Sequence, residues 1–388
     1  MKIALANDTY YPHVNGSSYF TQRLAFYLKK AGHDVRVVAP SRKTRSEYFE
    51  HEGIPVIGIP SIPVLIQKNF RFSPSMLAKR KIAKELKAFA PDLVHIQGHF
   101  FLSRTVAEAA RSLGIPVMGT NHFMPENLVH FLHLPKKPED MLKKLAWKDF
   151  KRIFNKLEII TTPTNAAANL LKINGFKKPV LPISCGIDLD RFNPKISSAE
   201  LKKKYDVPNR PTLIYIGRLD KEKNVDMVLE AFAEVVKKID VMFVIGGTGA
   251  EKSNLQKIAK DLGISKNVKF LGFVPDKEMP EFYHMGDCFV IAGTAELQSI
   301  VTLEAMASGL PVIAVNAVAL PELVKHKQNG YLFDINSPKH LASYIFNILS
   351  NKKLRQQMSE QSLKIIEKHD IKNTVKQFEK LYEKLIKE

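Results

Sequence analysis

The stretch CFVIAGTAELQSIVTLEAMASGLP, residues 288–311, contains the pattern that defines the fold of this chain. It begins with the apolar run Cys288–Ala292, which is typical of a buried strand bounded by a turn. From Ser299 the apolar residues recur at helical spacing, and Gly309 and Pro311 are typical of a helix end. The stretch therefore predicts a buried strand, a short loop and a helix.

Two carboxylates lie at this junction, Glu296 in the predicted loop and Glu304 in the predicted helix. The backbone N–H groups from Gln298 to Val301 would point toward the carboxyl end of the strand, where the helix dipole favours an anion. An anion and a polyol could share that place. For an isolated pair, a solvated loop residue and a helix-capping residue would explain the two Glu more simply, but the neighbouring motifs favour a binding site.

The alternation of strand and helix recurs along the whole chain. Apolar runs at 2–7, 34–39, 55–59, 92–97, 115–119 and 158–162 are separated by helical segments such as 18–31 and 76–89. A second series of runs covers 212–216, 241–245, 268–271, 288–292, 312–315 and 330–333. Strands alternating with helices predict parallel, doubly wound sheets, so we expect an α/β protein with two Rossmann-like domains.

The two series are separated by the turn-rich stretch 184–194. We therefore expect an N-terminal domain over residues 1–185 and a C-terminal domain over residues 186–370, with a cleft between them. The amphipathic segment 371–388 predicts a C-terminal helix that crosses back to the N-terminal domain.

The composition indicates a globular protein of a reducing compartment. The chain has 388 residues, of which 45% are hydrophobic, enough for two cores. Its two cysteines, Cys185 and Cys288, lie far apart beside apolar residues, so no disulfide framework is expected. The apolar stretch after Met1 is too short for a signal peptide, and no run approaches the ~18 apolar residues of a membrane span. We therefore expect a cytoplasmic protein.

The charge is strongly positive. The chain has 58 Lys and Arg against 39 Asp and Glu, which gives a formal net charge of +19. Such a protein prefers polyanions, and nucleic acid, an anionic bilayer and a phosphorylated substrate all fit. The sequence has no zinc-knuckle, ribonucleoprotein aromatic motif or basic low-complexity tail, so nucleic acid is not expected as a partner.

A pair of cations follows the first strand of the second series. The strand ends at Gly217, and Arg218 and Lys223 come directly after it. The planar fork of Arg and the compact charge of Lys together suit the oxygens of a diphosphate. An Arg and a Lys beginning a surface helix are otherwise simply solvated.

Two segments of the first series carry further candidate groups. Gly16, after the first strand, allows a ligand to approach the backbone closely, although a simple turn with Ser17 or Ser18 as N-cap explains the segment equally well. His122 follows the run 115–119 and could donate a hydrogen bond to a sugar hydroxyl or to developing charge.

A metal site is not expected from the histidines. Of His99, His122, His130 and His133, only His130 and His133 form a close pair, and they flank two apolar residues without a carboxylate partner.

Residues 138–158 predict a basic amphipathic helix. Its apolar residues recur at helical spacing: Met141, Leu142, Leu145, Ala146, Phe150, Ile153, Phe154 and Leu157. The residues that could contact an anionic membrane are Lys143, Lys144, Trp147, Lys148, Lys151 and Arg152. Each cation near an anionic surface contributes about 1 kcal/mol of attraction. A helix packed on a Rossmann sheet also needs an apolar face and often has a Lys-rich outer face, so both interpretations stay open.

Taken together, these motifs resemble the retaining glycosyltransferases of sequence family 4. The resemblance covers nearly the whole chain. It rests on the E-x7-E pattern from Glu296 to Glu304, on residues 217–219 with Lys223, and on the segment 184–192. It implies the GT-B fold, in which two Rossmann-like, doubly wound domains face each other across an interdomain cleft. The N-terminal domain would then be the acceptor side, and the C-terminal domain would bind the nucleotide sugar.

The resemblance also implies roles for individual residues. Arg218 and Lys223 would hold the donor diphosphate, Glu304 would meet the ribose, and Glu296 with the amides of 297–299 would hold the transferred sugar. The candidate catalytic residues are thus His122, Arg218, Lys223 and Glu296. The candidate donor-binding residues are Gly16, Gly217, Phe273, Val274, Leu297, Gln298, Ser299 and Glu304, of which Phe273 and Val274 would contact the base.

Two departures from the family pattern concern the substrates. Asn15 precedes Gly16 where paired glycines are common, and residues 297–299 read Leu-Gln-Ser where Gly-Phe-Gly is common. The Glu-x-Gln stretch and the segment 122–127 are similar to the subgroup that glucosylates diacylglycerol. We therefore expect a hexose, with glucose favoured, to move from a UDP-hexose rather than a GDP-hexose to the hydroxyl of a membrane lipid. The cations would replace a metal, so neither metal nor another cofactor is expected.

Two other functions stay open from the sequence. One is a related enzyme that transfers a mannosyl or glucosyl group to a soluble sugar or polysaccharide intermediate, or that epimerises a nucleotide sugar with water. The other is a non-catalytic protein that binds nucleotides or polyanions. A lipid acceptor would bring the cytoplasmic protein to the inner face of the membrane as a peripheral protein. The sequence defines no oligomeric state.

Overall fold

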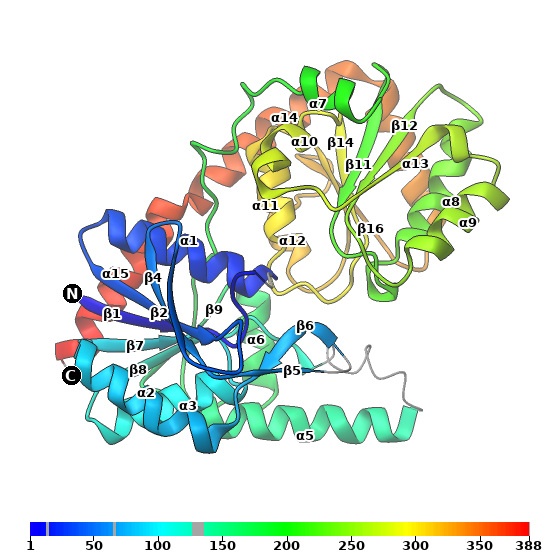
Figure 1. Cartoon of the computed structure of the whole chain (residues 1–388). Helices are drawn as coiled ribbons and strands as arrows, with labels where there is room; N and C mark the ends of the chain where they lie inside the picture. The colour runs from blue at the N-terminus through cyan, green and yellow to red at the C-terminus, as the bar shows by residue number, and fades with distance from the viewer. Residues whose placement is uncertain (13–14, 65–66, 126–135, 388) are drawn as a thin grey trace. The chain divides into compact units, whose positions relative to one another are not determined.

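A computed structural model describes residues 1–12, 15–64, 67–125 and 136–387 of the chain (Figure 1). It divides into two compact units. Unit 1 consists of residues 1–185 and 371–388, and unit 2 consists of residues 186–370. The division falls at the joint that the sequence indicates, whereas the acceptor and donor roles of the two units stay predictions.

Unit 1 has an eight-stranded sheet in the order β10-β9-β8-β7-β1-β2-β4-β3. Its strands are β1 (Lys2–Ala6), β2 (Asp34–Pro40), β3 (Glu47–His51), β4 (Ile54–Ile59), β7 (Leu93–Ile96), β8 (Val117–Thr120), β9 (Ile159–Thr162) and β10 (Val180–Pro182). All neighbours are parallel except β3, which runs antiparallel to β4. A separate hairpin pairs β5 (Ile62–Val64) with β6 (Gln67–Phe72). The six predicted strands are confirmed, and the sequence analysis missed β3, β5, β6 and β10.

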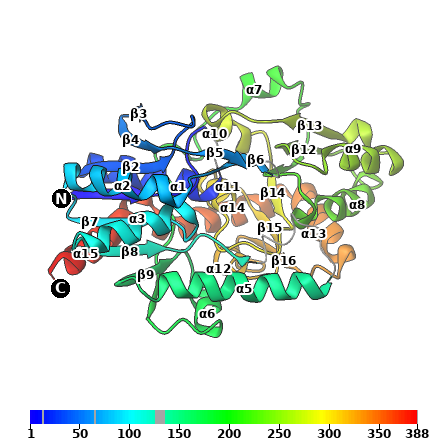
Figure 2. The same cartoon turned by 60° about the horizontal axis from the view of Figure 1, so that its bottom comes forward.

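Helices cover both faces of this sheet. They are α1 (Gly16–Lys30), α2 (Ser75–Phe89), α3 (Phe101–Ser112), α5 (Lys136–Phe154), α6 (Asn165–Ile173) and α15 (Ile371–Lys387). Figures 1 and 2 show α1 and α15 on one face and α2 and α3 on the other. Apolar residues of α2, α3 and α5 form one buried core with the strands. The apolar faces of these amphipathic helices therefore pack against the sheet.

The start of α1 differs from the expectation that Ser17 or Ser18 would be the N-cap. The N-cap is Asn15, whose Oδ1 accepts from the Ser18 N–H at 3.0 Å. Ser18 Oγ in turn accepts from the Asn15 N–H at 2.6 Å, which completes a capping box. The N-cap therefore lies two or three residues earlier than expected, because Asn is as good a cap as Ser.

The C-terminal helix α15 belongs to unit 1, in agreement with the predicted return of the chain. His95 Nδ1 of β7 and Tyr382 Oη hydrogen-bond at 2.8 Å in the buried interior. His33 Nε2 lies 2.9 Å from Glu379 Oε1 at the edge of the same contact. Both links tie the last residues of the chain to its first hundred.

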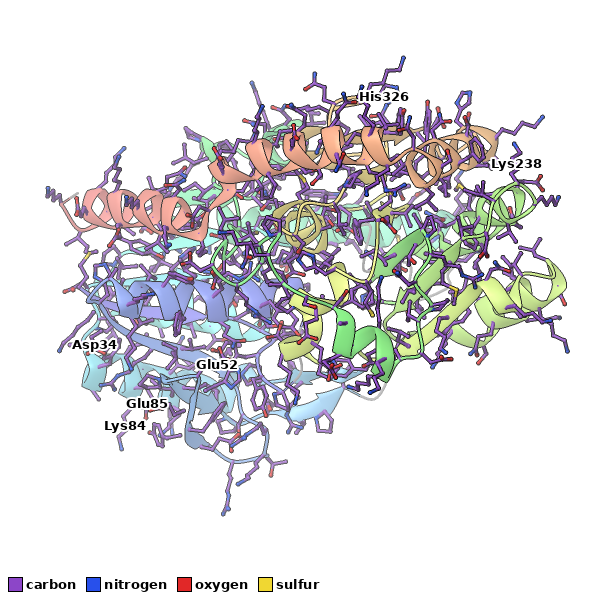
Figure 3. All side chains as sticks on the ribbon, turned by 90° about the horizontal axis from the view of Figure 1, so that it is seen from above. Asp34, Glu52, Lys84, Glu85, Lys238 and His326 are labelled. Carbon is purple, nitrogen blue, oxygen red and sulfur yellow. The ribbon has the colours of Figure 1, made fainter. Side chains whose placement is uncertain are left out.

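The antiparallel edge strand β3 is held by a buried carboxylate of α2. Glu85, labelled in Figure 3, accepts a hydrogen bond from Tyr48 Oη and pairs with Lys81 at 2.7 Å. The strand alternates half-buried and exposed residues rather than forming an apolar run. That is why the apolar-run criterion missed it.

Unit 2 has a six-stranded, wholly parallel sheet in the order β13-β12-β11-β14-β15-β16. Its strands are β11 (Thr212–Ile216), β12 (Met242–Gly246), β13 (Val268–Gly272), β14 (Cys288–Ile291), β15 (Val312–Val315) and β16 (Gly330–Phe333). Its helices are α7 (Ala199–Lys204), α8 (Val225–Val236), α9 (Lys252–Asp261), α10 (Met279–Tyr283), α11 (Ile300–Ala307), α12 (Leu320–Leu323), α13 (Pro338–Ser350) and α14 (Lys352–Ile366). All six predicted strands are confirmed. Cys185 of unit 1 and Cys288 of unit 2 are both buried.

A glycine turn after β12 packs directly on the segment that follows β11. A Cβ on Gly247 would lie 1.8 Å from the carbonyl oxygen of Gly217, and one on Gly249 would lie 2.3 Å from that of Leu219. Leu219 N–H donates to the Thr248 carbonyl at 2.9 Å. These glycines therefore allow two backbones to touch, and the contact fixes the loop that carries the predicted cations.

Candidate functional site

The order of strands in unit 2 predicts where a ligand binds. Strand β11 lies between β12 and β14, so the chain leaves the carboxyl ends of β11 and β14 in opposite directions along the sheet. Ligands of doubly wound sheets bind at such a switch point. Arg218 and Lys223 follow β11, and Glu296 follows β14. The two motifs found in the sequence thus meet at the expected edge.

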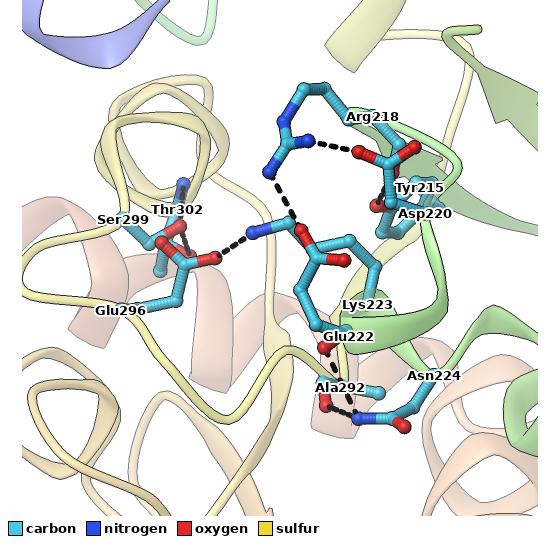
Figure 4. A network of polar contacts seen from close by, with 10 residues as sticks. All are labelled: Tyr215, Arg218, Asp220, Glu222, Lys223, Asn224, Ala292, Glu296, Ser299 and Thr302. Carbon is cyan, nitrogen blue, oxygen red and sulfur yellow. Dashed lines mark hydrogen bonds and ion pairs between the residues drawn. The ribbon is translucent and has the colours of Figure 1, made fainter. Parts of the chain in front are cut away.

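The structure brings these three side chains into one polar network (Figure 4). Lys223 Nζ donates to Glu296 Oε1 at 2.7 Å, and both side chains are mostly buried. The guanidinium of Arg218 pairs with Asp220 and, at 2.6 Å, with Glu222 Oε1. Without a ligand, each predicted phosphate-binding cation is therefore neutralised by carboxylates of its own unit.

Two hydrogen bonds fix the loop between β11 and α8. Tyr215 Oη donates to the Arg218 carbonyl at 2.9 Å, and burial raises the pKa of this phenol, so it stays a donor. Asn224 is in the left-handed region with φ 50° and begins α8. Its Nδ2 donates to the Ala292 carbonyl at 2.9 Å, which joins the loop to the end of β14.

The start of α11 has the predicted form, with Glu296 in the loop and Glu304 in the helix. Ser299 is the N-cap, and its Oγ accepts from the Thr302 hydroxyl at 2.8 Å. Leu297, Gln298 and Ser299 are all buried. The alternative of a solvated loop residue concerned Glu296, which is only 18% exposed and pairs with Lys223.

Glu304 is buried in unit 2 and has a partner that the sequence analysis did not identify. Tyr283 Oη, at the end of α10, donates to Glu304 Oε2 at 2.8 Å. Both side chains are buried, so the carboxylate is held in one orientation by a phenol. The sequence around Tyr283 gives no sign of this hydrogen bond, because the two residues are 21 positions apart and are brought together only by the fold.

The two residues proposed for the base differ in exposure. Phe273, directly after β13, has 66% of its surface exposed and is free to stack on a ring. Val274 is buried in the core of unit 2, and its contact with a base stays a prediction.

Unit 1 has its own switch point, where β1 lies between β2 and β7. His122, after β8, lies near it: its Nε2 and Gln97 Oε1 hydrogen-bond at 3.0 Å, and its ring lies 4.7 Å from that of Phe20. Burial lowers the pKa of His122 to about 3, so the imidazole is neutral at physiological pH. Gly16 is exposed as the first residue of α1.

Several buried polar atoms gather at this edge without a hydrogen-bond partner in the structure. They include Gln97 Nε2, Asn121 Nδ2, His99 Nδ1 and Asp8 Oδ2. Buried polar groups are normally satisfied, so such a cluster marks a place for ligand hydroxyls or water. Each of these residues stands at or just after the end of an apolar strand, a signal that is visible in the sequence.

Metal-binding clusters are not found among residues 1–12, 15–64, 67–125 and 136–387, where no three His, Cys, Asp or Glu side chains are arranged to hold an ion. His130 and His133, considered for zinc above, lie outside the described residues. The last part of the His122–Asn127 segment is also outside them.

The predicted basic helix is α5, and its two halves differ. In the C-terminal half, Phe150, Ile153 and Phe154 are buried in the unit 1 core. In the N-terminal half, Met141 and Leu145 are 62% and 53% exposed. The packed-helix interpretation therefore holds for the second half, while the first half presents apolar side chains to solvent. In Figures 1 and 2 this half extends beyond the sheet of its own unit.

The six candidate membrane contacts of α5 are not equally available. Trp147 is half-buried against the rings of Phe150 and Phe176. Lys151 donates to the Asn174 carbonyl at 3.2 Å, Arg152 pairs with Asp149 at 3.2 Å and Lys143 pairs with Glu139 at 2.5 Å. The most exposed of the six are Lys144, Lys148 and Arg152. In the parts of the chain that the structure describes, no helix combines the length and apolarity needed to cross a bilayer.

Comparison with known proteins agrees with this geometry. Residues 14–191 match the model for Glycosyltransferase Family 4, and residues 197–365 match the model for Glycosyl transferases group 1. The alpha-monoglucosyldiacylglycerol synthase of Streptococcus pneumoniae is 32% identical over 86% of this chain and 75% of its own. A GDP-mannose-dependent alpha-mannosyltransferase of Corynebacterium glutamicum is 27% identical over 86% of this chain and 77% of its own.

Solved structures show the same fold at lower sequence identity. HepE of Anabaena, solved in complex with UDP-glucose, superimposes with a TM-score of 0.79 at 19% identity, covering 99% of this chain and 100% of its own. The sucrose-phosphate synthase of Thermosynechococcus elongatus gives a TM-score of 0.79 at 18% identity, covering 99% of each chain. This protein therefore belongs to the family 4 glycosyltransferases and has their GT-B fold of two Rossmann-like domains.

Proposed function

We propose that this glycosyltransferase moves a hexose, with glucose favoured, from a UDP-hexose to the hydroxyl of a membrane lipid such as diacylglycerol, with retention at the anomeric carbon. The names of two relatives support the acceptor. Besides the Streptococcus enzyme, the alpha-monoglucosyldiacylglycerol synthase of Acholeplasma laidlawii is 27% identical over 93% of this chain.

The observation that carries the donor half of the proposal is the network around Arg218, Lys223 and Glu296. A nucleoside diphosphate brings two phosphates to the switch point of unit 2 and offers the cations oxygens in place of their carboxylate partners. Released from Lys223, Glu296 becomes an acceptor for sugar hydroxyls. Glu304, oriented by Tyr283, is then the acceptor for the ribose hydroxyls.

The chemistry follows from where the charge develops. As the bond between the anomeric carbon and the phosphate oxygen breaks, negative charge grows on the leaving diphosphate. Arg218, Lys223 and the first turn of α11 are the groups that stabilise this charge. The acceptor hydroxyl attacks from the face that the diphosphate leaves, and its proton passes to a leaving phosphate oxygen. The configuration at the anomeric carbon is therefore retained.

The acceptor half of the proposal rests on unit 1. The neutral imidazole of His122 and the amide nitrogens of Gln97 and Asn121, which have no hydrogen-bond partner, offer hydrogen bonds to hydroxyl groups. The N-terminal half of α5 combines exposed Met141 and Leu145 with exposed cations such as Lys144. This combination suits a helix that lies in the interface of an anionic bilayer. We accordingly propose a peripheral location on the inner face of the cell membrane and exclude Trp147 from the contact surface.

A second candidate is a mannosyltransferase that uses GDP-mannose. It is favoured by the Corynebacterium relative and by a GDP-mannose-dependent alpha-mannosyltransferase of Mycobacterium tuberculosis, 27% identical over 88% of this chain. The exposed Phe273 would stack on guanine as well as on uracil, so the base contact does not separate the two donors.

The test is a panel of UDP- and GDP-hexoses with and without diacylglycerol in anionic vesicles, with release of nucleoside diphosphate as the readout. Release from a UDP-hexose that depends on the lipid would support the proposal. Release from GDP-mannose alone would support the second candidate, and lipid-independent release would move the acceptor to a soluble sugar. Binding of a donor without any release would favour a non-catalytic binding protein.

A further inference from the structure

Unit 1 contains a cavity of about 280 Å³ between α3, α5 and the loops that follow β7 and β8. Aromatic and aliphatic side chains form most of its wall, among them Phe100, Phe123, Leu142 and Ala146. The volume lies just below the ~300–1,000 Å³ of pockets for small molecules. The cavity is therefore too large to be a packing defect, and its wall suits an apolar ligand.

The mouth of the cavity is lined by apolar side chains that are open to solvent. Phe101 at the start of α3 and Leu145 on α5 both line it, and each is 53% exposed. The Phe101 ring also contacts Phe72 of β6, edge to face, at 4.4 Å between centroids. Exposed apolar residues around an apolar cavity mark a place where an apolar ligand enters. Leu145 stands next to the exposed Lys144 in the N-terminal half of α5.

The wall also has two polar groups that need a partner. His99 Nδ1 and Arg104 Nε are buried, and neither has a hydrogen-bond partner in the structure. His99 is almost fully buried, and burial lowers its pKa to about 3, so it is neutral. The Arg104 guanidinium is held by an ion pair with Asp149 of α5, which leaves its Nε–H for another acceptor. An apolar ligand with one carbonyl oxygen would satisfy this wall.

We propose that this cavity binds one acyl chain of an ester-linked glycerolipid acceptor, with the ester carbonyl accepting hydrogen bonds from Arg104 Nε and His99. The second chain of a diacyl lipid would stay in the bilayer, because the volume accommodates a single chain. The inference rests on the proposed lipid acceptor. It adds which part of that lipid the enzyme binds, namely one acyl chain with its ester carbonyl. A free sugar would bind less favourably, because its hydroxyl groups would be buried against Phe100 and Phe123 without hydrogen-bond partners.

Trp147 provides a direct test, because it is the only Trp of the chain and follows the lining residue Ala146. A monoacylglycerol with bromine atoms along its chain should quench the fluorescence of Trp147 in a saturable way. Ala146→Phe fills the cavity from the same helix and should weaken this binding at least tenfold. The matched control is Ala88→Phe, an exposed position on α2 of the same unit, and it should bind like the wild type.

A second measurement uses unmodified protein and therefore does not depend on how Ala146→Phe folds. Transfer to monoacylglycerols below their critical micelle concentration should become about fourfold more efficient, in kcat/KM, for each methylene added until the cavity is full. An ether-linked analogue, which lacks the carbonyl, should lose about tenfold relative to the ester.

The outcomes separate this inference from the proposed function. Transfer to lipids of every chain length with equal kcat/KM, together with quenching unaffected by Ala146→Phe, would overturn the inference and leave the lipid glycosyltransferase intact. Absence of transfer to any lipid, with transfer to a soluble sugar, would overturn the proposed acceptor and the inference with it.

Discussion

Replacement of Arg218 by Ala is the sharpest test of the donor site. Half of the Arg218 side chain is exposed, so its ion pairs with Asp220 and Glu222 contribute at most about 1 kcal/mol to folding. Its proposed role in catalysis is larger, because loss of one donor to a developing anion costs about 2.7–4 kcal/mol. We therefore expect Arg218→Ala to lower kcat by about 100-fold or more while the protein stays folded. The removed cation also leaves two carboxylates beside the diphosphate, which adds to the loss.

The assay measures kcat and KM for release of nucleoside diphosphate, together with thermal unfolding of each variant. Arg191→Ala is the matched control, because Arg191 also pairs with a carboxylate of unit 2, Asp276 at 2.6 Å, and is about one-third exposed. The control should keep nearly wild-type turnover. A folded Arg218→Ala variant with kcat within threefold of the wild type would show that Arg218 does not stabilise the leaving group.

Three further predictions concern other parts of the two units. Tyr283→Phe should weaken binding of the nucleoside diphosphate by about tenfold, measured by titration calorimetry, because Glu304 loses the 2.8 Å hydrogen bond that orients it; unchanged affinity would refute this orienting role of Tyr283. Burial lowers the pKa of His95 and His99 from 6.5 to about 3, so below pH 6.5 the unfolded chain binds more protons and folding is weakened. Each His should cost unit 1 about 2 kcal/mol at pH 5 relative to pH 7.5, and calorimetry showing equal stability at both pH values would contradict this. Gly247→Ala should prevent unit 2 from folding, since its Cβ would lie 1.8 Å from a carbonyl oxygen and φ is +122°; resistance to limited proteolysis like that of the wild type would refute this.

Much of the fold could be predicted because the core strands are apolar runs bounded by turns. All twelve predicted runs form strands, since a parallel strand is buried on both faces and shows its burial directly in the sequence. The missed strand β3 lies at an edge, and its alternation of half-buried and exposed residues hides it. The missed N-cap Asn15 shows a different limit. Several residues before α1 could cap it, and the choice depends on backbone geometry that the sequence does not display.

The candidate site was predictable only in part, because a sequence shows which residues follow the strands but not which distant residues contact them. Arg218, Lys223 and Glu296 could be identified because each follows an apolar strand, and parallel strands bring their carboxyl ends to one edge. Their partners could not be assigned. Tyr283 reaches Glu304 across the fold, and the lining of the unit 1 cavity comes from two helices and two loops whose packing sets its size.

The carboxylates around the two cations change how the donor site should be understood. The sequence predicts that Arg218 and Lys223 bind phosphate. In the structure, each of them forms an ion pair with acidic residues of unit 2. A ligand must therefore displace Asp220, Glu222 and Glu296 from the cations rather than simply meet them. A single weak anion gains little from such an exchange, because it replaces one carboxylate contact by a similar one. In the proposed function, a diphosphate would engage both cations together and the sugar would use the released Glu296, so we expect the pairing to favour the complete nucleotide sugar over free anions.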